Sequence, residues 1–278
     1  MYNISTHPHI NIKSMNGINL DNGFAFCTIV YGQKYLKLSA TLIEQITGLG
    51  HTMFVLTNEP DALSNHEKII KIKYNKDYFS FHEKLVIVRE CLKTFDTAIF
   101  LDSDVVLIDI NDLNFFNDIQ PGLHIFATFG NIGSTFFSDD HPPCQHDDHR
   151  NTKYGARGVN FVETLGYKYK RQFHKEVDSE DYLEHFLEGR WILKKDNGKE
   201  NIFLEIWDSL VNFCEDFDKT LGYTNSIGAG EGAAMSIAAH NCGIATHIPS
   251  EIVETMNKHF ISNYQEKMDG TKPWNIGG

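Results

Sequence analysis

The sequence feature that most constrains the fold is an apolar run, Ile99–Leu107, that is interrupted by Asp102 and Asp104. A strand buried on both faces reads as a nearly continuous apolar run, and open α/β sheets bind ligands beyond the carboxyl ends of their strands. Two carboxylates at such an end need a partner cation. Hard divalent ions such as Mg2+ and Mn2+ take oxygen ligands and often serve substrate phosphates. The run therefore predicts a metal and diphosphate site, with an Asp-x-Asp in a solvated turn as the alternative.

The segments around this run alternate between strand and helix patterns. Strands are predicted at Phe24–Val30, Met53–Thr57, Ile69–Ile72, Ile99–Val106 and Gly122–Phe129, and helices at Tyr35–Ile46, Phe81–Leu92, Ile202–Cys214 and Gly230–His240. This order predicts an α/β fold with a mostly parallel sheet flanked by helices. The pattern becomes irregular beyond residue 110. No Gly-x-Gly-x-x-Gly or Gly-Lys-Ser/Thr element follows a strand, which argues against a dinucleotide or P-loop site.

Length and composition limit the function classes. The 278 residues, of which 41% are apolar and 22% charged, suit an ordinary globular protein with a sizeable core. The formal net charge of −12 argues against a nucleic-acid binder, because such binding needs clustered Lys and Arg. The five cysteines form no Cys-x-x-Cys pair, and no apolar run reaches membrane-spanning length. We therefore expect a cytoplasmic protein without a transmembrane segment, whose contact with any membrane is peripheral.

Four features resemble the GT-A class of nucleotide-sugar glycosyltransferases, in particular the glycogenin-like and lipopolysaccharide-galactosyltransferase-like enzymes of glycosyltransferase family 8. They are the first strand with its helix, Lys84 ahead of the motif strand, the motif Leu101-Asp102-Ser103-Asp104-Val105, and His259 with Lys272-Pro273-Trp274 in the tail. The resemblance implies a Rossmann-like GT-A fold and a single catalytic domain over residues 1–278. Residues of about 24–110 would bind the nucleotide sugar, and those of about 111–278 would form an irregular acceptor side.

The same resemblance implies roles for individual residues. The metal ligands would be Asp102, Asp104 and His259, holding Mn2+ or Mg2+. The residues that would contact the donor are Thr28, Val30, Tyr31, Lys84, Asp102, Ser103 and Lys272. The tail departs from the family pattern, because several residues separate His259 from Gly270-Thr271-Lys272.

Glu231 is the candidate catalytic residue, facing the donor or acceptor sugar. It opens a predicted helix after the turn Gly228-Ala229-Gly230, and GT-A enzymes often carry an acidic residue on a comparable late helix. The alternative is a helix-start carboxylate stabilised by the macrodipole.

The segment His141–His149 is a competing metal signal, since its His and Cys side chains could bind Zn2+. Structural zinc sites usually have paired ligands at both ends of a loop, and no second pair is evident here. We favour a polar acceptor-side loop.

The sequence thus predicts a metal-dependent hexosyltransferase. It would move a hexose from a nucleoside-diphosphate sugar, with UDP as the expected nucleotide, to a glycan or other hydroxyl acceptor with retention of configuration. An inverting enzyme with Glu231 as general base, a sugar nucleotidyltransferase and a non-catalytic sugar-binding module stay open. A nucleotidyltransferase would carry a Gly-rich basic loop after the first strand, and Val30-Tyr31-Gly32-Gln33-Lys34 offers little of it. Release of UDP only with an acceptor present would distinguish the transferase from the module.

Overall fold

The computed structural model describes residues 11–12, 23–74, 82–108, 110–131, 184–220, 231–248, 255–256 and 258–262. The chain divides into two compact units, Met1–Gln120 with Glu254–Gly278, and Pro121–Val253. The expected donor part of about 24–110 and acceptor part of about 111–278 stay predictions, and the first unit also contains residues 254–278. The single catalytic domain over residues 1–278 stays a prediction.

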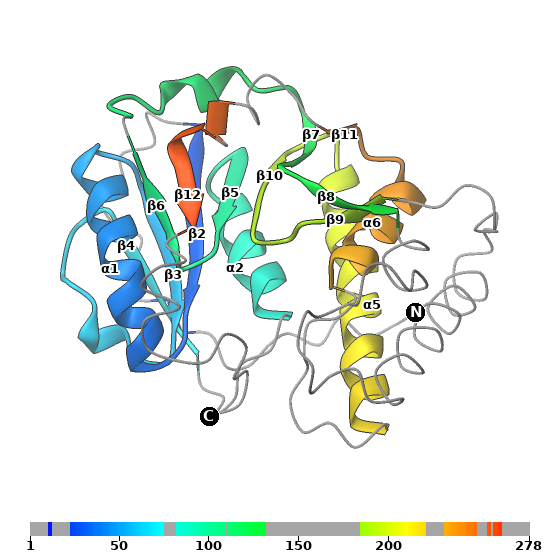
Figure 1. The fold of residues 1–278 in the computed structure, drawn as a ribbon, viewed down its shortest axis with the longest axis horizontal. Coiled ribbons are helices and arrows are strands. Elements are labelled where there is room, and N and C mark those ends of the chain that lie inside the picture. The colour runs from blue at the N-terminus through cyan, green and yellow to red at the C-terminus, as the bar shows by residue number, and fades with distance from the viewer. Residues whose placement is uncertain are drawn as a thin grey trace. The chain divides into compact units, whose positions relative to one another are not determined.

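A parallel sheet forms the centre of the first unit (Figure 1). Its strands, in spatial order, are β1 (Asn11–Ile12), β4 (Ile69–Lys73), β3 (Met53–Thr57), β2 (Phe24–Val30) and β5 (Thr97–Leu101). β2 pairs in parallel with β3 and β5, and β3 pairs in parallel with β4, whereas β1 runs antiparallel to β4. Every residue of β3 and β5 is buried, as expected for a parallel sheet covered on both faces. The predicted α/β fold with a mostly parallel sheet is confirmed in this unit.

Different elements cover the two faces of this sheet. Consecutive residues of a strand point to opposite faces, so Phe26 and Cys27 of β2 mark the two sides. On one side, Cys91 of α2 (His82–Leu92) approaches the backbone oxygen of Ala25 at 4.0 Å. On the other side, Phe26 packs against Phe116, with ring centroids 5.7 Å apart.

A two-stranded ribbon contributes to the second of these faces. It consists of β6 (Val105–Leu107) and β12 (Phe260–Ser262), which pair antiparallel. Phe260 stacks on Phe26 at 6.4 Å, and Phe116 belongs to the short helix η2 (Asn114–Asp118). α1 (Gly32–Gly48) packs against β6 (Figure 1). A second short helix, η1 (Pro60–Ala62), follows β3.

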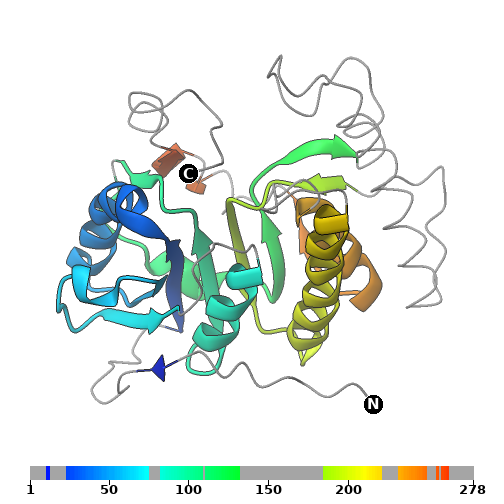
Figure 2. The same ribbon diagram turned by 90° about the horizontal axis from the view of Figure 1, so that it is seen from below.

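The second unit has its own strands and two long helices. β7 (Gly122–Ile125) pairs antiparallel with β10 (Arg190–Lys194) and in parallel with β11 (Thr246–His247). α5 (Lys199–Thr220) and α6 (Glu231–Cys242) lie side by side (Figure 2), which confirms both predicted helices. Trp207 of α5 packs on Trp191 of β10, with ring centroids 5.2 Å apart.

The strand expected over residues 122–129 is wrong in its extent. β7 ends at Ile125, and β8 (Thr128–Asn131) pairs instead with β9 (Glu184–Phe186) in a separate ribbon. All four residues of β7 are buried, and the two strands differ in their hydrogen-bond partners, since β7 pairs with β10 and β11.

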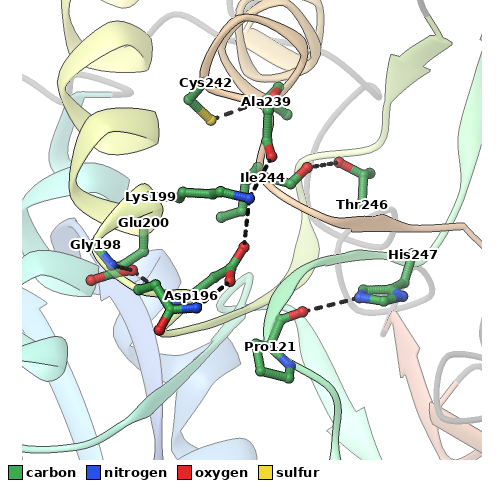
Figure 3. A network of polar contacts seen from close by, with 12 residues as sticks. Pro121, Asp196, Gly198, Lys199, Glu200, Ala239, Cys242, Ile244, Thr246 and His247 are labelled. Carbon is green, nitrogen blue, oxygen red and sulfur yellow. Dashed lines mark hydrogen bonds and ion pairs between the residues drawn. The ribbon is translucent and has the colours of Figure 1, made fainter.

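Side-chain contacts close the turn between β10 and α5 (Figure 3). The Glu200 carboxylate accepts hydrogen bonds from the backbone N–H groups of Asp196 at 2.8 Å and Gly198 at 3.1 Å. Lys199 Nζ donates to the carbonyl of Gly243, just after α6, at 3.0 Å. These contacts satisfy backbone groups at helix ends and tie α5 to α6. No helix in the described part of the chain is both long and apolar enough to cross a membrane.

Candidate active site

Asp102, Ser103 and Asp104 form the whole connection between β5 and β6. The backbone N–H of Val105 donates to the carbonyl of Asp102 at 3.1 Å, which closes a tight turn. Ser103 and Asp104 are buried, whereas the side chain of Asp102 is 42% exposed. The two aspartates therefore lie beyond the carboxyl end of a buried parallel strand, where the sequence pattern places them.

Lys84 reaches this turn from α2. Its Nζ lies 3.7 Å from Oδ1 of Asp102, and its side chain is only 5% exposed. The same Nζ lies 5.3 Å from the ring centroid of Phe100, on β5. A buried ammonium is costly unless a negative charge compensates it, and Asp102 supplies one. The structure thus brings together two residues that the sequence separately assigned to donor binding.

The three candidates at the end of β2 differ in exposure. Cys27 pairs with Phe100, so the residues that follow Cys27 run alongside the end of β5. Thr28 and Val30 are fully buried, and Oγ1 of Thr28 has no hydrogen-bond partner among the described residues. Tyr31 is partly exposed and packs edge-on against Tyr74, with ring centroids 6.3 Å apart. Of the three, Tyr31 is therefore the side chain that a ligand can approach directly.

Sequence reasoning missed three residues at the same edge of the sheet. Asn58 and Glu59 follow β3, and Tyr74 follows β4. Oδ1 of Asn58 accepts a hydrogen bond from the N–H of Gly32 at 3.0 Å, and Glu59 accepts one from the amide of Gln33. Both contacts hold the start of α1, directly after Tyr31. Their signal in the sequence is a polar or aromatic residue immediately after a buried strand.

His259 lies away from the two aspartates. In the β6–β12 ribbon Ser262 pairs with Val105 and Phe260 pairs with Leu107, so His259 lies beside Ile108. Its Nδ1 is 3.0 Å from the carbonyl of Ile108 and donates to it, while its own carbonyl accepts from the N–H of Ile108 at 2.7 Å. Ile108 is four residues beyond Asp104, about 13 Å along an extended strand.

The structure therefore does not bring His259 to the aspartate turn, and its role as a metal ligand stays a prediction. Among the residues that the structure describes, no group of three or more His, Cys, Asp or Glu side chains could hold a metal ion.

Three other predictions of the sequence are not tested by this geometry. Glu231 is the first residue of α6, as expected, but its side chain lies outside the described part of the structure. Lys272 and the segment His141–His149 also lie outside the described residues.

The aspartate turn fits a divalent ion that is shared with a substrate. Mg2+ sites commonly use one or two carboxylates and complete their coordination with water and substrate phosphates. Asp102 and Asp104 provide hard oxygen ligands, and the exposed part of Asp102 is open to an incoming ion. The described residues thus suit a metal that binds together with a phosphate group.

The first unit is therefore an α/β structure with an acidic turn beyond a parallel strand and a buried lysine beside that turn. No family model matches the sequence, and no similar curated protein sequence is found.

Two solved structures to which the chain is similar are both glycosyltransferases. One is the galactosyltransferase LgtC in complex with donor and acceptor sugar analogues, with 12% identity, 71% of this chain and 65% of LgtC covered, and a TM-score of 0.35. The other is the bifunctional glycosyltransferase WbbM in its apo form, with 13% identity, 92% of this chain and 51% of WbbM covered, and a TM-score of 0.40. The chain thus spans less than two thirds of either protein, and TM-scores this low transfer no activity to it.

Proposed function

We propose that this protein is a metal-dependent glycosyltransferase. It would move a hexose from a nucleoside-diphosphate sugar, with UDP as the expected nucleotide, to a glycan or other hydroxyl acceptor. The observation that carries the proposal is the turn Asp102–Asp104 beyond a buried parallel strand, with the ammonium of Lys84 3.7 Å from Asp102. One strand end thus carries carboxylates that can bind a metal ion and an ammonium that can bind phosphate. This combination suits a diphosphate ligand.

The chemistry of sugar transfer explains why these groups are needed together. Cleavage of the bond between sugar and phosphate leaves a diphosphate, whose developing negative charge must be stabilised. Mn2+ or Mg2+, when bound by Asp102 and Asp104, supplies Lewis-acid stabilisation of that charge. Lys84 donates to the phosphate oxygens, and Tyr31 offers a partly exposed ring to the nucleotide base. These residues hold the leaving group and orient the donor.

The stereochemical outcome is a separate part of the proposal. The resemblance to glycogenin-like enzymes supports retention, whereas Glu231 acting as a general base on the acceptor hydroxyl would give inversion. NMR of the first-formed product anomer distinguishes the two outcomes. Retention is expected.

The proposal predicts that a nucleotide sugar raises the Tm only when Mn2+ is present, because a ligand that binds the native state stabilises it by mass action. A thermal-shift screen of nucleotide sugars, with Mn2+ and with EDTA, identifies the donor. The variants Asp102→Asn and Asp104→Asn should each abolish the shift, while the exposed Asp118→Asn should retain it. An unchanged shift in both site variants would contradict the metal site.

Turnover is then measured with the donor that gives the largest shift. Release of UDP that requires an added hydroxyl acceptor supports a transferase, and donor binding without release under any acceptor supports a sugar-binding module. His259→Ala belongs in the same series. Loss of the Mn2+-dependent shift would support its predicted metal role, whereas a lower Tm with the shift intact would fit its hydrogen bond to Ile108.

A further inference from the structure

We propose that Lys84 weakens metal binding in the donor-free protein and thereby couples the binding of the metal to that of the donor diphosphate. The inference rests on the proposed function, because it takes the turn Asp102–Asp104 as the metal site. It assigns Lys84 a regulatory effect on that site in addition to a contact with phosphate.

The position of Lys84 is unusual for a lysine. It alone among the lysines that the structure describes is buried, with 4% of its surface exposed. Its Nζ lies 3.7 Å from the carboxylate of Asp102 and 5.3 Å from the ring centroid of Phe100. The surrounding protein limits screening by water, so the charge of this ammonium acts strongly on its neighbours.

The ammonium and a metal ion would therefore compete for the same carboxylate. A divalent cation that binds Asp102 comes close to Lys84, because Nζ is already 3.7 Å from Oδ1 of that residue. The two cations would repel each other, and water screens this repulsion little because the side chain of Lys84 is only 5% exposed. Without a donor, Lys84 thus offsets part of the negative charge that attracts the metal.

A bound diphosphate changes this balance. Its oxygens can ligate the metal and accept hydrogen bonds from Lys84 at the same time, so both cations gain a shared anion. The metal should then bind more tightly with the diphosphate present, and the diphosphate more tightly with the metal present, by the same factor. Lys84 increases this mutual gain in affinity, because it weakens metal binding only while the diphosphate is absent.

The variant Lys84→Met tests the inference, since methionine is also a long unbranched side chain and lacks the charge. The affinity for Mn2+ is measured by electron paramagnetic resonance of free Mn2+, with and without UDP, after correction for the Mn2+ that UDP itself binds. Without UDP, Lys84→Met should bind Mn2+ at least about fivefold more tightly than the wild type, because about fivefold is the factor that full screening by water would leave for two like unit charges about 4 Å apart. The gain in Mn2+ affinity on adding UDP should shrink by a similar factor.

Lys93→Met is the matched control. Lys93 directly follows α2 and also pairs with a carboxylate, that of Glu90 at 2.6 Å, but it is 62% exposed. The variant Lys93→Met removes the same charge from the same region of the chain, but from an exposed position. Its affinity for Mn2+ should therefore equal that of the wild type. Lys84→Arg, which keeps the charge, should also retain weak Mn2+ binding and the wild-type effect of UDP.

The outcomes separate the inference from the proposed function. Mn2+ affinity that is unchanged or lower in Lys84→Met, while Asp102→Asn abolishes Mn2+ binding, would overturn the inference and leave the metal site standing. Wild-type Mn2+ binding in both Asp102→Asn and Asp104→Asn would instead remove the proposed function. If circular dichroism shows that Lys84→Met does not fold, Lys84→Gln provides the same comparison with a neutral polar side chain.

Discussion

Single side chains at the carboxyl edge of the first sheet divide by burial. Asp102 and Tyr31 are partly exposed, whereas Lys84 and Asp104 are buried. A ligand therefore meets Asp102 and Tyr31 first, and the buried groups set the charge that it experiences. Residue type alone does not identify the side chains that a ligand can contact. Thr28 has a hydroxyl suited to donor binding, but this hydroxyl is buried and cannot be reached from solvent in this structure.

His51 provides a pH-dependent prediction at the scale of one residue. Its ring is buried against Phe24, with ring centroids 5.0 Å apart, and burial lowers its pKa from 6.5. Asp112 opposes this shift and Lys68 adds to it. The folded state thus favours the neutral imidazole, and as the pH falls the unfolded chain takes up the proton at a higher pH than the folded protein does. The stability contribution is complete above about pH 6.5 and is lost as the pH falls through the folded-state pKa.

Urea unfolding at pH 7.5 and pH 5.5 measures this effect. We expect His51→Phe to lose less stability than the wild type between these two pH values, by at most about 1.4 kcal/mol, because pH 5.5 lies one unit below the ordinary pKa of 6.5. His240→Gln, at an exposed position on α6, should keep the wild-type dependence. Equal pH dependence in His51→Phe and the wild type would contradict the assignment.

At the scale of elements, α1 and the strand that leaves the aspartate turn are joined through one side chain. Gln45 of α1 donates from Nε2 to the carbonyl of Leu107 at 2.8 Å and accepts from the N–H of Leu107 at 3.0 Å. The side-chain amide thus pairs with the backbone of β6 as a neighbouring strand would. Since β6 begins directly after Asp104, this pairing helps to position the turn.

We expect Gln45→Ala to destabilise the protein by about 2 kcal/mol, because both backbone groups of a buried Leu107 lose their partner. It should also weaken Mn2+ binding, since the turn is no longer held from this side. Urea unfolding and Mn2+ titration measure the two effects, with the exposed neighbour Glu44→Ala as the control. A variant that loses stability but binds Mn2+ with wild-type affinity would show that Gln45 does not position the site.

At the scale of the whole molecule, the division into two units predicts that a substitution in one unit destabilises that unit more than the other. Gly122 in the second unit has φ +123°, and an added Cβ would lie 2.3 Å from the carbonyl oxygen of Ala245. That carbonyl accepts from the N–H of Leu123 at 2.8 Å, where β7 and β11 meet. A side chain at this position therefore forces the two strands apart.

Gly122→Ala should cost at least about 2 kcal/mol, because it combines a strained backbone with a steric clash. Hydrogen exchange should show the largest loss of protection in β7, β10 and β11, with less in β2, β3 and β5. Gly48→Ala, at the end of α1 with nothing within 4 Å of an added Cβ, should be neutral or slightly stabilising. Equal loss of protection in both units would show that they unfold as one.

The sequence by itself determined the strands β2, β3 and β4 with their helices, and the location of Asp102 and Asp104 at a strand end. These features follow from local apolar periodicity and from the residue types that end a strand, which act within about ten residues. The chemistry of two oxygen ligands also follows from residue type alone. The assignment of His259 to the same site, by contrast, rests only on the GT-A resemblance, which implies a metal-binding histidine in the C-terminal part of the chain. The strand predicted over Ile99–Val106 is wrong in its extent, because residues 102–104 form a turn that separates β5 from β6.

Only the tertiary structure decided which distant residues meet. The ion pair of Lys84 with Asp102, the bridge from Gln45 to Leu107 and the contact of His259 with Ile108 join residues that are 18, 62 and 151 positions apart. Strand register and helix packing place them, and a shift of register changes the neighbours of a side chain without changing the local sequence pattern. The acidic turn could therefore be predicted, and the resemblance also assigned Lys84 to the donor, whereas the ion pair of Lys84 with Asp102 and the side chains that hold the turn could not be predicted.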